Sequence, residues 1–116
     1  KALKETIPWS KKIIVEAETP EQAKEAVKAG ADWILLDEMP PENVRTLVPS
    51  LRNLNSNSTN DSSPNQLILE VSGINPKMLK TYASTGVDLI STSYPVTRSS
   101  WIDFSMRFNQ IKQEKK

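Results

Sequence analysis

The sequence predicts an α/β fold in which parallel strands are joined by crossover helices, as in a barrel built from repeated strand–helix units. Apolar, strand-like runs alternate with helical patterns along most of the 116 residues. A carboxylate ends each of the first two runs, at Glu16 and at Asp37. The two halves also share one pattern: Ala29-Gly30-Ala31-Asp32-Trp33-Ile34 is similar to Thr85-Gly86-Val87-Asp88-Leu89-Ile90. Each copy is typical of a helix C-cap, a turn and the entry to a strand.

The composition is that of an ordinary globular domain, and it excludes several kinds of chemistry. A net charge of +1 gives no case for binding nucleic acid or an anionic membrane. No run approaches the roughly 18 apolar residues of a membrane span. Without Cys and His there are no disulfides, thiolates, imidazole bases or common zinc sites. Chemistry must therefore use carboxylates, Lys, Arg, hydroxyls and backbone amides. A cytoplasmic location is expected, with the nucleus left open.

The predicted strands are of two kinds. Four are short apolar runs at residues 12–17, 33–37, 67–71 and 87–91. The first of them does not alternate, which is typical of a strand buried on both faces. A fifth segment near the end alternates apolar and polar residues, which predicts a half-buried strand. Its apolar positions are Ile102, Phe104, Met106 and Phe108.

The first crossover helix has strong signals at both ends. Thr19 is expected as its N-cap, with Pro20 at the first helical position and Gln22 as the capping-box partner. Gly30 is the expected residue just past its end. Residues 1–9 have the pattern of the end of a separate helix, closed by a proline.

Two further helices and one insertion complete the predicted domain, which spans residues 1–116. A helix begins at residues 40–42, and Pro49 is expected to interrupt it or end it early. Another spans residues 76–85. Between them, residues 53–66 are rich in Asn and Ser and have too few apolar side chains to fold, so a flexible surface insertion is expected.

Glu16 and Asp37 are the first candidate site residues. Both follow neighbouring parallel strands, so we expect them side by side at the carboxyl edge of the sheet, where α/β folds bind ligands. Two carboxylates so placed can hold sugar hydroxyls, a Mg²⁺ ion or a developing positive charge. The structural alternative is that each carboxylate only caps the turn that follows it.

Two loops at the same edge are candidates for binding a phosphate group. Ser72-Gly73 follows the third strand and can offer backbone N–H groups, while Thr92 and Ser93 follow the fourth strand and add hydroxyls. Paired loops after successive strands form the usual phosphate site of such barrels. Arg98 follows closely and can reach an anion, although an ordinary surface arginine is the alternative.

The order of these motifs resembles one enzyme family. The runs that carry the resemblance are Lys12-Ile13-Ile14-Val15-Glu16, Leu35-Leu36-Asp37, Leu69-Glu70-Val71-Ser72-Gly73-Ile74 and Ile102-Asp103-Phe104-Ser105-Met106. Together they resemble quinolinate phosphoribosyltransferase, also called nicotinate-nucleotide pyrophosphorylase (carboxylating). The resemblance spans nearly the whole chain outside the Asn/Ser insertion, and it corresponds to the C-terminal part of the family's barrel domain.

The resemblance implies an incomplete α/β barrel beside a small α/β-sandwich domain, in an oligomeric enzyme. The implied reaction joins quinolinate to phosphoribosyl pyrophosphate with Mg²⁺, giving nicotinate mononucleotide, pyrophosphate and CO₂ in NAD synthesis. In that frame Glu16 and Asp37 fall on the family's acidic pair near the ribose and the metal. Ser72 and Gly73 then fall on one phosphate loop, and Ser93 falls on the other.

Several residues depart from the family pattern. Ile74 takes the place of the second Gly in the usual Ser-Gly-Gly loop. Ser93 stands where the second loop often has Gly, which loses close backbone approach but gains a hydroxyl. Glu38 stands where Asn is common and adds negative charge, and Thr97 lies near the place of a common His.

Three functions therefore remain open. In the first, the resemblance implies that the chain is the C-terminal piece of a phosphoribosyltransferase, expected to be inactive alone and completed by an N-terminal part that carries most of the family's cations. Alternatively, it is a non-catalytic barrel fragment that serves as a binding or assembly module in a larger complex. The third reading is an unrelated phosphate-binding barrel enzyme. In each case the open edge of an incomplete barrel predicts a stable partner, either the rest of the barrel or another protein.

Overall fold

Four parallel strands form a single sheet in the order β1-β2-β3-β4. The computed structural model describes residues 6–8, 10–58, 66–100, 102 and 104–106. The strands are β1 (Ile14–Ala17), β2 (Trp33–Asp37), β3 (Ile68–Ser72) and β4 (Leu89–Ile90). Strands that follow one another in the chain are neighbours in the sheet, so each connection is a crossover between parallel strands. The predicted fold class is confirmed.

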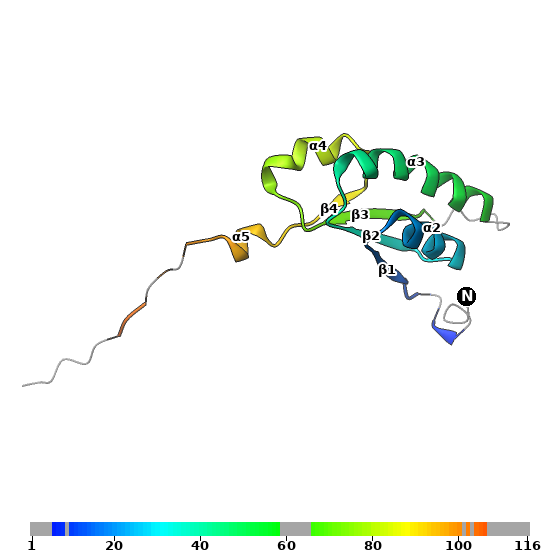
Figure 1. The fold of residues 1–116 in the computed structure, drawn as a ribbon. Helices are drawn as coiled ribbons and strands as arrows, with labels where there is room; N and C mark the ends of the chain where they lie inside the picture. The colour runs from blue at the N-terminus through cyan, green and yellow to red at the C-terminus, as the bar shows by residue number, and fades with distance from the viewer. Residues whose placement is uncertain (1–5, 9, 59–65, 101, 103, 107–116) are drawn as a thin grey trace, which may run out of the picture.

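The crossovers are helical, and they lie on one side of the sheet. They are α2 (Pro20–Ala29), α3 (Pro41–Ser58), and the 3₁₀ turn η1 (Pro76–Met78) continued by α4 (Leu79–Ala83). A short helical turn that was not predicted, α5 (Tyr94–Thr97), follows β4. Figure 1 shows α3 and α4 running over the same side of the sheet. In the described residues, no helix has the length and apolar character to cross a bilayer.

The hydrophobic core lies between the helices and one face of the sheet. The strand residues that face it are Ala17, Ile34, Leu36, Leu69 and Val71, all at most 1% exposed. They belong to one cluster with the stripe of α3 made of Val44, Leu47, Val48 and Leu51. The alternate strand residues face the other way and are half-buried or exposed, as Ile14 (57%) and Leu89 (42%) illustrate. In the described part of the chain this second face, hereafter the open face, has no covering helix.

Helix α2 begins and ends where the sequence predicts. The hydroxyl of Thr19 accepts the amide of Gln22 at 3.3 Å, and the side-chain oxygen of Gln22 accepts the amide of Thr19 at 3.2 Å. Gly30 follows the helix in the left-handed conformation, with φ of 89°. The capping box and the C-cap are both confirmed because they depend on residues within one turn of each other.

Helix α3 differs from the prediction in two respects. It runs through Pro49 to Ser58, so the expected break is wrong. Pro49 and Arg45 are exposed, and the Arg45 carbonyl that loses its helical partner can therefore bond to water. The start of the predicted Asn/Ser insertion, residues 53–58, is also helical, and Leu54 packs against the core there. Residues 59–65 of that insertion lie outside the described residues.

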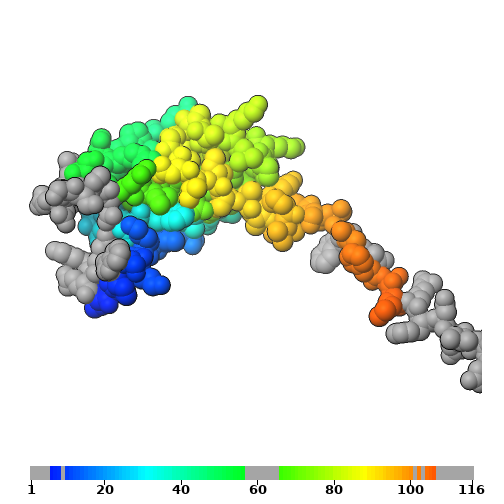
Figure 2. Space-filling view, turned by 180° about the vertical axis from the view of Figure 1, so that it is seen from behind, coloured from blue at the N-terminus to red at the C-terminus, as the bar shows by residue number. Residues whose placement is uncertain are grey.

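The predicted strand at the C-terminal end is not formed among the described residues. Ile102, Phe104 and Met106 have no regular structure and are 75%, 87% and 82% exposed. Figure 2 shows this orange segment leaving the body of the molecule. An alternating pattern makes a strand only where another strand pairs with it, and this segment lies away from the sheet. Phe108 and most of the helix predicted at residues 1–9 lie outside the described residues, although Thr6 is helical.

The repeated pattern of the two halves has the same structural role in each. The carboxylate of Asp32 accepts the amide of Ile13 at 2.9 Å, and that of Asp88 accepts the amide of Leu69 at 2.8 Å. Each aspartate thus satisfies an amide of the preceding strand region just before its own strand begins. Asp88 also accepts two contacts from the guanidinium of Arg52 in α3, at 2.9 and 3.0 Å.

We expect Asp88→Ala to lower the free energy of unfolding by roughly 1–3 kcal/mol, because it leaves the Leu69 amide without its acceptor. The ion pair adds little, since the Arg52 and Asp88 side chains are 37% and 29% exposed to solvent. Denaturant titration at one fixed protein concentration measures the change. Glu25→Ala, on the exposed side of α2, is the control. A loss no larger than that of the control would contradict the role of Asp88.

Candidate functional site

Asp37 is fixed at the carboxyl edge of the sheet by Ser72. The two residues lie opposite each other at the ends of β2 and β3. The hydroxyl of Ser72 donates to the carboxylate of Asp37 at 2.6 Å, and both side chains are half-buried. The sequence predicts that Ser72-Gly73 offers backbone N–H groups to a phosphate, and the Ser72 hydroxyl has a separate partner in Asp37. Its position therefore suits orienting that carboxylate.

Glu16 shares a face with Asp37 but does not lie level with it. The register pairs Glu16 with Leu35, and Asp37 lies two residues beyond Leu35. Strand spacing and rise place the two acidic Cα atoms about 8 Å apart, on the open face. The expected side-by-side pair at the strand ends is thus corrected, because β1 ends at Ala17 and Glu16 lies one row below the edge. Carboxylates of both residues can still act on one extended ligand.

A hollow of about 290 Å³ lies beyond this edge, between the loops that follow β3 and β4. Its volume is just under the usual range of ligand pockets, roughly 300–1,000 Å³, and suits a phosphate group with part of an attached sugar. The residues that line it are Glu38, Gly73, Ile74, Asn75, Thr92, Ser93, Tyr94, Thr97 and Arg98. The two loops predicted from sequence are therefore brought together, and Arg98 lies with them. Ser72 and the two acids Glu16 and Asp37 lie outside this lining.

Thr92 joins the two loops. Its hydroxyl donates to the Ile74 carbonyl at 2.9 Å and accepts the amide of Tyr94 at 3.2 Å. With both bonds made, Thr92 holds the shape of the hollow, whereas Ser93 is exposed at its wall. This division between the two hydroxyl residues could not be read from sequence, since it depends on contacts between separate loops.

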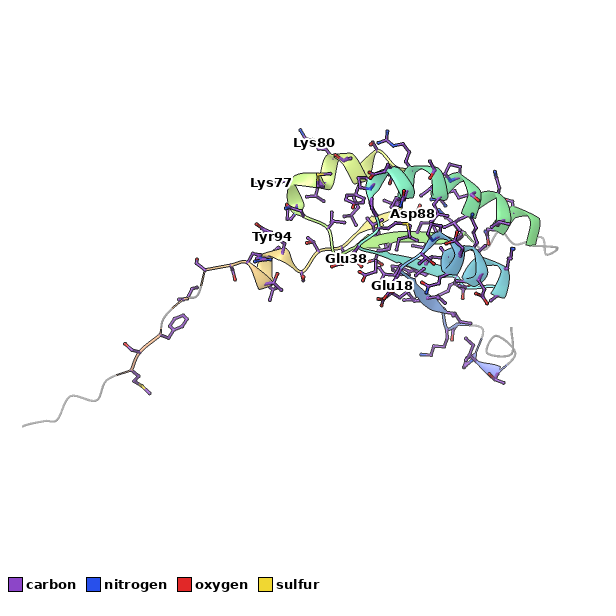
Figure 3. The ribbon with its side chains drawn as sticks, in the orientation of Figure 1. Glu18, Glu38, Lys77, Lys80, Asp88 and Tyr94 are labelled. Carbon is purple, nitrogen blue, oxygen red and sulfur yellow. The ribbon has the colours of Figure 1, made fainter. Side chains whose placement is uncertain are left out.

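Gly73 and Glu38 are packed tightly at the rim of the hollow. Both have left-handed backbone conformations, with φ of 69° and 48°, a region that residues with a Cβ rarely adopt. A Cβ added to Gly73 would lie only 2.7 Å from Cγ of Glu38 and 3.5 Å from a carboxylate oxygen of Asp37. Any other residue at this position would strain the backbone and displace the stem of Glu38, which lies against it. Figure 3 shows Glu38 and Tyr94 at this end of the sheet.

Tyr82 holds the turn after β2 from the helical side. Its hydroxyl donates to the carbonyl of Met39 at 2.9 Å in a buried contact. Burial raises the pKa of Tyr82 above its usual value of 10.0, and the negative charge of Glu42 raises it further. The turn that carries Asp37 and Glu38 is thus fixed both by Ser72 and by Tyr82.

This pKa predicts a pH-dependent effect of Tyr82→Phe. Below about pH 10 the free energy of unfolding of the variant is expected to be lower than that of the wild type by about 1 kcal/mol, because the variant lacks the hydrogen bond to Met39. Above that pH the unfolded tyrosine ionises before the buried one, so the wild type loses stability that phenylalanine does not lose. Denaturation of both proteins between pH 7 and about pH 11 measures the difference. A difference that grows with pH would contradict the inferred environment of Tyr82.

Parallel strands joined by helices, with loops gathered around a hollow at their carboxyl edge, define a segment of a βα barrel. The family described as quinolinate phosphoribosyl transferase, C-terminal domain, matches residues 1–107. The chain belongs to this family, and the resemblance noted in the sequence is confirmed.

Curated relatives extend well beyond this chain. A probable nicotinate-nucleotide pyrophosphorylase (carboxylating) of Methanothermobacter thermautotrophicus is 35% identical over 113 residues, which cover 95% of this chain and 37% of the relative. A protein of the same description from Synechocystis is 34% identical over 90% of this chain and 33% of its own length. The chain thus spans about a third of the length of these relatives.

Solved structures show the same relation. The nicotinate-nucleotide pyrophosphorylase from Francisella tularensis superposes with a TM-score of 0.62 at 26% identity, over 80% of this chain and 30% of that chain. The enzyme of the same name from Ehrlichia chaffeensis gives a TM-score of 0.60 at 27% identity, over 78% and 29%. The fold of this chain is therefore similar to part of the fold of those proteins.

Proposed function

We propose that the chain is the part of a carboxylating nicotinate-nucleotide pyrophosphorylase that holds the phosphoribosyl substrate. In the proposed reaction, quinolinate and phosphoribosyl pyrophosphate give nicotinate mononucleotide, pyrophosphate and CO₂. The observation that carries the proposal is the hollow formed by the loops after β3 and β4, directly beside Asp37. Membership of the family supports it, and so does the size of the hollow.

In this proposal the hollow binds a phosphate group of the substrate. The backbone of Gly73 and Ile74 borders the hollow, and Ser93 offers a hydroxyl from the opposite loop. Arg98 supplies the positive charge of the lining, and Thr92 keeps the loops together. A phosphate held here would place its sugar toward the open face of the sheet.

The carboxylates then act on the sugar. As pyrophosphate leaves, positive charge develops on the ribose, and fixed negative groups stabilise that charge. Asp37 is oriented for this role by Ser72 at 2.6 Å, and Glu16 lies on the same face, one row back from the edge. Ser72 is thus a positioning residue in this proposal.

Mg²⁺ fits these donors only together with the substrate. The described residues contain no group of three or more Asp, Glu, His or Cys side chains that could hold a metal ion. Mg²⁺ is commonly bound by one or two carboxylates with substrate phosphates and waters, so Asp37 and Glu16 would hold it directly or through water. When bound, it would neutralise negative charge on the pyrophosphate group.

The site also needs a partner chain segment. The open face carries apolar side chains such as Ile14 and Leu89 that are 57% and 42% exposed. Hydrophobic surface of this kind, at the edge of an incomplete barrel, is usually covered. We propose that the covering part corresponds to the other two-thirds of the relatives, and that the assembled protein is an oligomer.

A non-catalytic binding or assembly module is the second candidate, and one observation favours it. Glu38 adds a carboxylate to the lining of the hollow, where a phosphate would have to bind. Such a charge opposes phosphate binding and would suit a fragment that has lost its substrate.

Product formation tests the proposed function. The chain alone is expected to form no nicotinate mononucleotide from quinolinate, phosphoribosyl pyrophosphate and Mg²⁺, whereas the protein assembled with its N-terminal part is expected to form it. An assembled, folded protein that forms no product would favour the module. A chain that sediments as a monomer and unfolds cooperatively by itself would contradict the need for a partner.

A further inference from the structure

The lining of the hollow carries two opposite charges. Among the described lining residues, Glu38 is the acid and Arg98 is the base. The other side chains there are neutral, and the backbone of Gly73 and Ile74 offers dipoles only. An anion that enters the hollow therefore meets one full negative charge as well as one full positive charge.

The structure fixes the backbone that places Glu38 in the hollow. Its amide donates to the Ser72 carbonyl at 3.3 Å, and the next residue, Met39, is 3% exposed and accepts the hydroxyl of Tyr82. The left-handed conformation of Glu38, with φ of 48°, is unfavourable for glutamate. Outliers of this kind persist where the surroundings impose them, and they concentrate at functional sites.

Charge repulsion depends on the charge of the ligand. The interaction of Glu38 with a dianion is twice its interaction with a monoanion at the same place. Within the hollow the separations are shorter than the Debye length of about 10 Å at 0.1 M salt, so screening is incomplete. Glu38 must then disfavour a doubly charged phosphate more than a singly charged one.

We propose that Glu38 is a specificity-determining residue of the hollow, which lowers its affinity for dianionic phosphate relative to singly charged phosphate groups. This inference rests on the proposed function of the hollow as a phosphate site. In the assembled enzyme, Glu38 would thereby favour a phosphate whose second charge is neutralised by a bound cation over the free dianion.

The test compares two probes on the chain assembled with its N-terminal part, since the site is proposed to need that part. Methyl phosphate carries two charges at pH 8 and dimethyl phosphate carries one, and amide chemical shifts of residues 73–75 and 92–94 report binding. Glu38→Gln removes the charge and keeps the side-chain length. This variant is expected to raise the affinity for methyl phosphate about tenfold and the affinity for dimethyl phosphate about threefold at low salt. Both gains should be smaller at high salt. Glu25→Gln, an exposed carboxylate of α2, is expected to change neither.

The outcomes separate this inference from the proposed function. If the wild type binds methyl phosphate at these loops but Glu38→Gln tightens both probes equally, or neither, the role of Glu38 is overturned. If neither probe shifts these loops in either protein, the hollow is not a phosphate site and the proposed function of the loops is overturned with it. A gain for the dianion that is larger than the gain for the monoanion supports both.

Discussion

Asp37→Asn is expected to lower the turnover of the assembled enzyme by roughly 10²–10³-fold, the usual loss when one fixed electrostatic group is removed from a transition state. Asparagine keeps an oxygen that can accept the Ser72 hydroxyl, now 2.6 Å from the carboxylate, so the fold changes little. Only the negative charge is lost. Glu16→Gln is expected to lower turnover only about tenfold. Glu16 lies one row from the edge and so acts at a greater distance from the reacting atoms than Asp37.

Turnover at saturating substrate and the free energy of unfolding are measured together for both variants. Glu25→Gln, which removes an exposed carboxylate from α2, is the matched control and should match the wild type in both measurements. Unchanged turnover in Asp37→Asn and in Glu16→Gln would exclude the proposed role of the acids. A loss of turnover in proportion to a loss of unfolding free energy would assign the two acids a structural role instead.

Gly73→Ala is expected to have the second largest effect, on substrate binding. The new Cβ would lie 2.7 Å from Cγ of Glu38, so either that side chain or the backbone of the loop must move. The left-handed conformation, with φ of 69°, adds a cost of roughly 1–2 kcal/mol for alanine. If that strain is relieved by displacing the loop, binding the substrate must restore the loop at a similar cost. We therefore expect KM for phosphoribosyl pyrophosphate to rise about tenfold or more.

Gly30→Ala separates the effect of backbone strain from the effect of displacing the loop after β3. Gly30 has a φ of 89° and ends α2, away from the hollow, so alanine there meets the same backbone strain without touching the loops. Gly30→Ala should lower the free energy of unfolding by the strain alone, roughly 1–2 kcal/mol, and leave KM unchanged. If Gly73→Ala also leaves KM unchanged, the loop after β3 does not bind the substrate.

Elements with local signals could be predicted from the sequence. Thr19, Gln22 and Gly30 act on amides and carbonyls within one turn, so helix α2 was located correctly at both ends. The strands were located to within two residues because their apolar runs are bounded by turns. The repeated Gly-x-Asp pattern indicated two equivalent strand entries, although the amides that Asp32 and Asp88 accept were not foreseen.

Features that depend on contacts between distant segments could not be predicted. The register that places Glu16 opposite Leu35 is set by pairing across the sheet. Pro49 is tolerated because it lies on the exposed side of α3. The alternation around Phe104 predicted a strand, but in the structure this segment lies away from the sheet.

Glu38 was identified in the sequence only as an unusual residue after Asp37. Its place in the hollow follows from its left-handed backbone and from its packing against Gly73, which lies in the loop after β3. A glutamate gives no local signal for such a conformation, whereas glycine or asparagine would.

A crystal structure of the assembled protein with phosphoribosyl pyrophosphate tests the central claim most directly. A phosphate group of the ligand should lie within hydrogen-bond distance of the Gly73–Ile74 backbone and the Ser93 hydroxyl, with the ribose over the open face beside Asp37. A ligand bound elsewhere, with the loops after β3 and β4 empty, would contradict the account.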